Sequence, residues 1–440
     1  MPMLAVMHDY RPRFGVPKTA LIAATAGCLA FGFATPSLAA EEESASDENM
    51  CILAGSASNI STADASPDET SAPVLTEADG DALRVATFDA NLSRSAAGDL
   101  YEDLSAPGAE DAAEVARVIQ QARPDVLVLT GIDVDAGDET AEAFNTNYLA
   151  VGAQDSDGMT YPYSYTAPSN AGVESGADLD RNGTIGGPGD ALGYGDFPGQ
   201  SSMIVYSKYP IETDKVRDFT SLSWSKMPNN SIPDDVTDLE RSMLPLASVS
   251  HWDVPIDVDG ESVHILASAA ADASEGANSA ERNQDQVRFW EDYLDQDTEY
   301  ITDHRGNRGP LDQDAQFIIA GSLKADPNGN GPADPTAISS LLESDVVTDP
   351  EPVRTLASSD VDQGGQSIDS GLPFHTAPDP TSSSSSYRAD YVLPSSDMNV
   401  VNSGILETDA ESRDNYRGFF GMHSNDSANH LVWTDTTIEN

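Results

Sequence analysis

Short apolar segments that are typical of buried strands recur along this chain between residues 83 and 434. Asp125 is followed by the continuous apolar run Val-Leu-Val-Leu up to Leu129, which indicates a strand covered on both faces of a sheet. Apolar side chains recur on one helical face in residues 110–123, which end before Pro124, and in residues 280–294. This alternation of strand and helix signals predicts an α/β fold.

One pair of segments carries a strong hairpin signal. The turn pair Asp259-Gly260 separates the strand segments 254–257 and 262–267. Further segments with the composition of strands are 83–88, 202–207, 316–321, 389–393, 400–406 and 430–434. Hairpins mixed with helices in a chain of 440 residues predict two β-sheets that pack as a sandwich and are flanked by helices.

The charge balance restricts the partners that the chain can bind. The net charge is -52, from 74 acidic and 22 basic residues. A field this negative repels the phosphates of nucleic acids and of anionic membranes, so we expect no strong nucleic-acid binding. Acid-rich and lysine-poor surfaces are a device of halophilic proteins, because salt screens the self-repulsion. The composition therefore favours a saline habitat, and the alternative is an ordinary soluble secreted protein.

The N-terminal residues have the pattern of a targeting segment. A basic region with Arg11 and Lys18 precedes the apolar stretch 19–34, and Ser37-Leu-Ala39 is a small-x-small cleavage site. We predict a signal peptide at residues 1–39, and the alternative is an uncleaved membrane anchor. Residues 40–82 are rich in Ser, Ala, Asp and Glu, which predicts a disordered linker. The folded domain is then residues 83–440, secreted or held at the cell surface, without a membrane span after cleavage.

Several motifs resemble one known family. Val85-Ala-Thr-Phe-Asp89-Ala-Asn91, Arg123-Pro-Asp-Val-Leu-Val-Leu129 and Tyr387-Arg-Ala-Asp390-Tyr-Val-Leu-Pro394 are similar in combination to motifs of the endonuclease/exonuclease/phosphatase superfamily, and to a secreted bacterial branch of it. The resemblance covers nearly all of residues 83–440. It implies the deoxyribonuclease-I-like fold, a four-layer α/β sandwich in which helices flank a two-layer β-sandwich. It also implies a hydrolase that uses one or two divalent cations, usually Mg²⁺.

The resemblance assigns functional positions that this chain fills with other residues. Family members hold the metal with an Asn on the first strand and a Glu at the end of the second, and bind phosphate with a His on a central strand. The corresponding residues here are Asp89, Gly131 and Ala269. Asp89 can still bind a cation, but Gly131 offers no side-chain ligand and Ala269 no donor.

Two further motifs of the family are altered. Its Gly-Asp-x-Asn segment, which orients water, is replaced by Gly321-Ser322-Leu323-Lys324, and its C-terminal Ser-Asp-His by Ser427-Ala428-Asn429. Losing one general base already costs about 10²–10⁴ in rate. We therefore predict a pseudoenzyme kept as a binding or structural module, in which the ammonium of Lys324 replaces the charge of the metal.

The alternative is an active metal-dependent phosphodiesterase, nuclease or phosphatase with a rebuilt site. The remnants available for it are Asp89, Asn91, Asp133, Asp390 and His430. A shift of one residue along the last strand would be needed to bring His430 to the position of the lost histidine, and such a shift turns a side chain to the other face. Mg²⁺ would be a cofactor only if these remnants still bind it.

One loop resembles the start of an EF-hand. Asp178, Asp180, Asn182 and Thr184 place oxygen ligands at alternate positions, and Asp190 follows the twelfth position, where Gly189 stands in place of the usual Glu. The pattern predicts a structural calcium site, and the alternative is a turn rich in Asp, Asn and Gly without metal. A third functional hypothesis is calcium-dependent assembly at the cell surface with an unknown partner.

Overall fold

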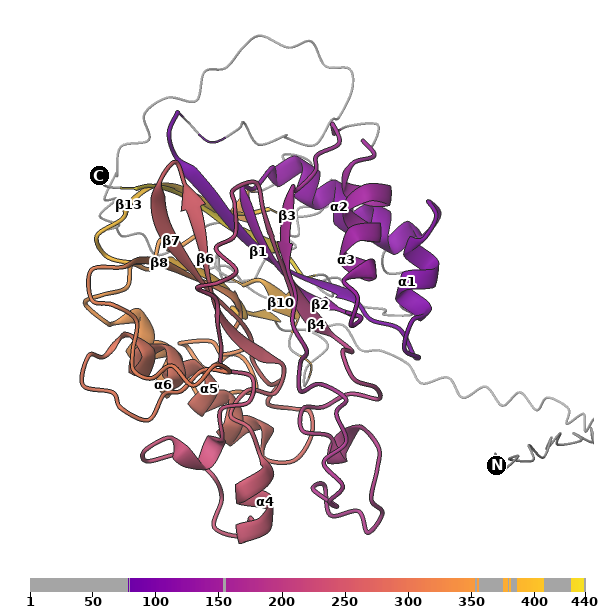
Figure 1. Cartoon of the computed structure of the whole chain (residues 1–440), viewed down its shortest axis with the longest axis vertical. Helices are drawn as coiled ribbons and strands as arrows, with labels where there is room; N and C mark the ends of the chain where they lie inside the picture. Colours follow the sequence, from indigo (N-terminus) through magenta and orange to yellow (C-terminus); the bar gives the residue numbers. More distant parts are fainter. Residues whose placement is uncertain are drawn as a thin grey trace, which may run out of the picture. The chain divides into compact units, whose positions relative to one another are not determined.

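Two β-sheets that pack face to face organise the chain (Figure 1). The computed structural model describes residues 78, 80–152, 156–352, 354–355, 375–378, 380, 386–406 and 429–438. The predicted signal peptide, most of the predicted linker and Ala428 lie outside the described residues. Among the described residues, no helix is both long and apolar enough to span a membrane.

Within the described residues, the first sheet has seven strands. Their order across the sheet is β3 (Tyr163–Tyr165), β4 (Ser202–Ser207), β2 (Val126–Ile132), β1 (Leu83–Leu92), β14 (Leu431–Thr437), β13 (Asn399–Leu406) and β9 (Arg354–Thr355). β1 runs parallel to β2 and antiparallel to β14. All seven residues of β2 are buried, which explains why its sequence is apolar without interruption.

The second sheet has five strands. Their order is β12 (Asp390–Pro394), β8 (Gln316–Ser322), β7 (Glu261–Ala269), β6 (Ser250–Val258) and β5 (Arg217–Asp218). β6 and β7 form the hairpin that Asp259-Gly260 predicts, and both turn residues have positive φ. β7 and β8 are parallel. A separate ribbon pairs β10 (Ala377–Pro378) with β11 (Ser386–Tyr387).

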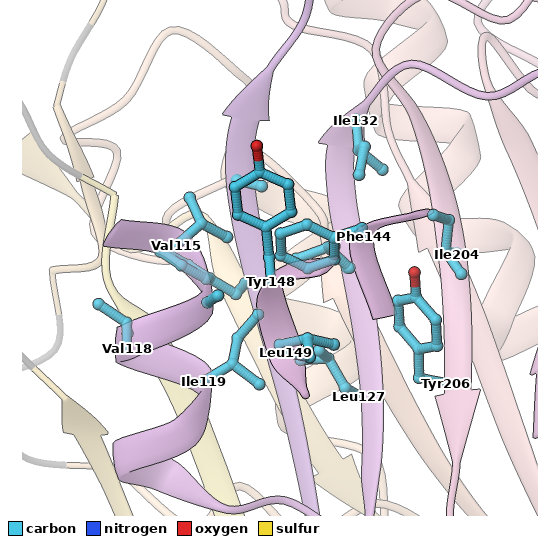
Figure 2. Packing of buried hydrophobic residues seen from close by; sticks show 14 of the residues in the cluster. Val115, Val118, Ile119, Leu127, Ile132, Phe144, Tyr148, Leu149, Ile204 and Tyr206 are labelled. Carbon is cyan, nitrogen blue, oxygen red and sulfur yellow. The ribbon is translucent and has the colours of Figure 1, made fainter. Parts of the chain in front are cut away.

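Helices cover the outer face of each sheet. The first sheet is covered by α1 (Asp99–Leu104), α2 (Glu110–Ala122), α3 (Glu139–Phe144) and the π-helical turn η1 (Asn145–Leu149). Figure 2 shows Phe144 of α3 beside Tyr148 of η1, and both belong to the same buried cluster as Ile119 of α2 and Leu127 of β2. The second sheet is covered by α5 (Ser279–Leu294) and α6 (Thr336–Leu342). The 3-10 turns η2 (Pro188–Asp190) and η3 (Trp224–Lys226) and the short helix α4 (Asp238–Met243) lie in connecting segments.

Three hydrophobic cores define four layers. One core lies between α1–α3 and the first sheet, a second lies between the two sheets, and a third lies between the second sheet and α5 with α6. The middle core contains Val128 from the first sheet and Ile265 and Ile318 from the second, all fully buried. The predicted sandwich flanked by helices is therefore confirmed.

Candidate active-site groove

A groove lies at the carboxyl ends of four strands, β1, β2, β7 and β8. Asp89, Gly131, Ala269 and Ser322 stand at these strand ends and line the groove, and Lys324 follows two residues after β8. The groove has a volume of about 250 Å³. Because β1 is parallel to β2 and β7 is parallel to β8, the ends of each pair meet at one edge of its sheet. The structure thus brings together five of the positions that the resemblance singled out.

Gly131 occupies a position that no larger residue can fill without a rearrangement. Its φ is +66°, in the left-handed region. A Cβ atom at this position would lie 2.0 Å from Oδ1 of Asp89 and 3.0 Å from the backbone nitrogen of Asn91. Asn91 is exposed, and its N–H donates to Oδ1 of Asp89 over 3.3 Å. The side chain of Asp89 therefore fills the space that a glutamate at position 131 would need.

Lys324 projects into the groove from a fixed backbone. The N–H groups of Leu323 and Lys324 both donate to the carbonyl of Ala389, over 2.8 and 2.9 Å, and Lys324 has φ +50°. Burial lowers the pKa of the Lys324 ammonium, but four carboxylates together raise it above its ordinary value: Asp89, Asp272, Glu275 and Asp390. Within the described residues, none of them comes within the 4.0 Å of an ion pair. Lys324 lines the groove without a direct ion pair to any of these four carboxylates.

Asp390 is the most deeply buried of these carboxylates. It lies on β12 opposite Ser322 of β8 and is fully buried. Burial, and then the charge of Asp89, raise the pKa of Asp390 to about 7. The hydroxyl of Thr376 donates to its Oδ2 over 2.8 Å, while its Oδ1 has no hydrogen-bond partner. The hydroxyl of Ser322 is close enough to lower this pKa, but it lacks the geometry of a hydrogen bond.

Asp133 is engaged in holding three chain segments together. It is buried and accepts from the hydroxyl of Ser93 over 2.8 Å, from the N–H of Arg94 over 2.7 Å and from the N–H of Ser201 over 2.9 Å. Burial, opposed by these hydrogen bonds, raises the pKa of Asp133. This arrangement leaves the carboxylate little capacity to bind a metal.

The two C-terminal remnants lie close to β1 but do not line the groove. The side-chain amide of Asn429 donates to the carbonyl of Asp89 over 3.1 Å. His430 is buried, and its backbone N–H donates to the carbonyl of Thr376 over 2.9 Å. Neither is among the lining residues of the groove.

The groove does not fit the divalent metal that the resemblance implies. Gly131 supplies no ligand, and the ammonium of Lys324 stands among the remaining carboxylates. In the described part of the chain, one cluster of carboxylates has its ligand atoms within 4.8 Å of one another: Asp178, Asp180 and Asp190. Their neighbours Leu179, Gly189 and Ala191 line the groove, but these three carboxylates do not. We therefore derive no catalytic step through a metal in the groove.

The EF-hand-like loop brings its three aspartates together. Asp190 is buried and accepts from the N–H groups of Leu179 and Gly186, over 2.6 and 2.9 Å. The side-chain amide of Asn182 donates to Asp180 over 2.7 Å, and the oxygen of the same amide accepts from the N–H of Thr184. These hydrogen bonds are compatible with either interpretation of the loop, so calcium binding stays a prediction.

Asp272 and Glu275 also line the groove, but they were not predicted from the sequence. Both lie in the segment between Ala269 at the end of β7 and Ser279 at the start of α5. Two acidic residues directly after a strand that ends at a functional position are a signal that could have drawn attention to them. Tyr194, which is 47% exposed, lines the groove from the loop before β4.

Two packed sheets with helices on both outer faces, and a polar groove at the strand ends, define a protein with the deoxyribonuclease-I-like fold. The sequence of residues 87–412 matches the model of the Endonuclease/Exonuclease/phosphatase family. The chain belongs to this family. The match includes the positions from Asp89 to Asp390 and ends before Asn429.

Several solved structures of low sequence identity also match this chain. An endonuclease/exonuclease/phosphatase from Beutenbergia cavernae is 17% identical, with 82% of this chain and 72% of that chain covered and a TM-score of 0.43. A family protein from Bacteroides thetaiotaomicron is 12% identical, with 82% and 98% covered and a TM-score of 0.42. The beta toxin of Staphylococcus aureus is 15% identical, with 81% and 100% covered and a TM-score of 0.37. A comparison with curated protein sequences gave no match.

Proposed function

We propose that this protein is a catalytically impaired member of the family whose groove binds a ligand without hydrolysing a phosphoester. The observation that carries the proposal is the ammonium of Lys324 among the carboxylates of Asp89, Asp272 and Glu275, where the family's chemistry needs a divalent cation. Secretion and a saline habitat remain predictions from the N-terminal segment and the charge balance.

The groups that stabilise and attack a phosphate are missing together. A metal ion normally neutralises the developing charge on the phosphate oxygens, and a base and an oriented water supply the nucleophile. Here Gly131 and Ala269 carry no polar side chain, and Asp133 is held by three donors. Residues that act as a unit do not lose activity additively, so little hydrolysis is expected to survive.

The decisive test is a hydrolysis assay of the full chain with Mg²⁺, Mn²⁺ or Ca²⁺, on plasmid DNA and on a chromogenic phosphodiester. We expect no turnover above that of Asp89→Ala prepared in parallel. Turnover that is lost in Asp89→Ala would overturn the proposal and favour a rebuilt phosphoesterase, the alternative that the sequence left open. Equal turnover in both proteins that does not track the chain through purification is a contaminant, whereas equal turnover that tracks the chain would also overturn the proposal.

A gain-of-function control is available, and the structure decides its design. Family residues can be restored at three positions in Ala269→His/Ser322→Asp/Lys324→Asn, whereas Gly131→Glu would collide with Asp89. If the triple variant binds Mn²⁺ and the natural protein does not, the three natural side chains together account for the lack of metal binding. Equal Mn²⁺ binding by both proteins in the groove would contradict this explanation.

A further inference from the structure

We infer that the groove takes a small aliphatic diamine, and neither a phosphate ester nor a metal ion. This inference rests on the proposed function, because a groove that bound phosphoesters for hydrolysis would need a cation for the phosphate. It is carried by the balance of charges in the groove, by a buried hydroxyl on its floor and by an exposed aromatic ring that lines it.

Carboxylates outnumber available cations in the groove. Asp89, Asp196, Asp272 and Glu275 line it, against the two basic residues Lys324 and Arg282. Arg282 is fully engaged, since its guanidinium donates to four backbone carbonyls, those of Leu192, Pro245, Leu246 and Ala247. These carbonyls are neutral, so Arg282 keeps its positive charge but has no donor left for a ligand. Four carboxylates still face only two cations, so the groove repels a phosphate and attracts a further positive charge.

Burial first, and neighbouring carboxylates second, raise the pKa of two acidic groups at the groove. Partial burial, with the charges of Asp272 and Asp89, raises the pKa of Glu275 even though Lys324 lowers it. Burial and the charge of Asp89 also raise the pKa of Asp390, which lies behind the groove. Its Oδ1 accepts no hydrogen bond. A ligand with ammonium groups would supply the missing charge and donors.

The floor of the groove contains a buried polar atom without a partner. Thr130 is 1% exposed and lines the groove, and its hydroxyl oxygen has no hydrogen-bond partner. Ser322 is equally buried and also lines the groove, but its hydroxyl lies near the carboxylate of Asp390. Because an unpaired buried hydroxyl is costly, the hydroxyl oxygen of Thr130 indicates a polar ligand that donates hydrogen bonds to the floor.

An exposed aromatic ring, that of Tyr194, lies against the chain segment that carries Asp272 and Glu275. A Cβ atom placed on Gly276 would lie 3.4 Å from Cδ2 of Tyr194, so the ring is seated against the residue that follows Glu275. An exposed aromatic face beside a carboxylate is suited to an ammonium group, which gains both an ion pair and a cation–π contact.

The size of the site and the absence of a close carboxylate cluster in it favour a small organic cation. The groove volume of about 250 Å³ is below the range of about 300–1,000 Å³ of drug-sized pockets. A metal ion needs three or more oxygens within its short coordination distance, and these carboxylates lack that spacing. A diamine can place one ammonium near Glu275 and the other near Asp89 without bringing the carboxylates together.

The test is calorimetry of the full chain with 1,4-diaminobutane in a chelating buffer, beside 1,4-butanediol and inorganic phosphate. We expect saturable binding of the diamine alone, and about a tenfold or greater loss of affinity in Asp272→Asn/Glu275→Gln. The matched control is Asp259→Asn/Glu261→Gln, an exposed pair at the far end of the β6–β7 hairpin. Lys324→Gln should bind the diamine more tightly, because it removes a competing ammonium.

Two outcomes would overturn the inference. Equal losses of diamine affinity in the two double variants would mean that the diamine responds only to the diffuse negative charge of the surface. Saturable phosphate binding that disappears in Lys324→Gln would make the groove an anion site. Neither outcome touches the proposed absence of hydrolysis, which fails only if the phosphodiester assay shows turnover that tracks the chain.

Discussion

The position of Gly131 allows a quantitative prediction about Gly131→Ala. A non-glycine residue in the left-handed region costs about 1–2 kcal/mol. The added Cβ would also lie 2.0 Å from Oδ1 of Asp89 and 3.0 Å from the backbone nitrogen of Asn91. Overpacking of this kind costs about 1–3 kcal/mol. We therefore expect Gly131→Ala to lower the free energy of unfolding by about 2–5 kcal/mol.

The assay is urea-induced unfolding of the full chain followed by intrinsic fluorescence, with the change in midpoint converted through the slope of the transition. Gly329→Ala is the matched control, because Gly329 has φ +69° and an added Cβ would meet only one atom, at 3.9 Å. Gly329→Ala should lower the free energy of unfolding only by the cost of the left-handed backbone conformation, about 1–2 kcal/mol.

A second variant separates the collision from backbone strain. In an Asp89→Ala background the 2.0 Å contact is absent, so Gly131→Ala should cost about 1 kcal/mol less there than in the natural protein. If Gly131→Ala and Gly329→Ala cost the same, or if removing Asp89 gives no relief, the side chain of Asp89 does not fill the space beside residue 131 and the reasoning is refuted.

Two further predictions concern other carboxylates. Because the pKa of Asp390 is raised from 3.8 to about 7, the native state holds a proton there that the unfolded chain releases, so this group's contribution to stability is present below pH 4 and is lost as the pH rises to about 7. Asp390→Asn should therefore flatten the fall in unfolding free energy between about pH 4 and pH 7, and an unchanged slope would contradict the assignment. For the EF-hand-like loop, we expect calorimetry with Ca²⁺ to give a heat of binding that Asp178→Asn/Asp180→Asn removes, and no heat in the natural protein would favour a turn without metal.

Most of the fold could be predicted from the sequence, because its strands are either wholly buried or bounded by strong turns. The continuous apolar run after Asp125 predicts the strand β2. The turn pair Asp259-Gly260 predicts the β6–β7 hairpin and the pairing of its strands. Short elements were missed, among them α4, none of whose residues is buried, and the two-residue strands β5 and β9. Such elements are set by tertiary contacts, which leave little periodicity in a single sequence.

The groove could be predicted in part. Motif positions at strand ends located Asp89, Gly131, Ala269, Ser322 and Lys324, since the ends of paired parallel strands meet in space. The contributions of Asp272, Glu275 and Tyr194 depend on how two irregular loops fold back over the strand ends. No local pattern encodes that path, so these residues appear only in the three-dimensional arrangement.

The place of β14 in the first sheet has a consequence for the kinetics of folding. β14 inserts between β1 and β13, and the ion pair of Arg84 with Asp435 joins residues 351 positions apart in the chain. Until β14 arrives, β1 presents an unpaired edge, which is a template for association with other chains. Closing so long a loop is slow, so the half-built sheet is the species in which aggregation competes with folding.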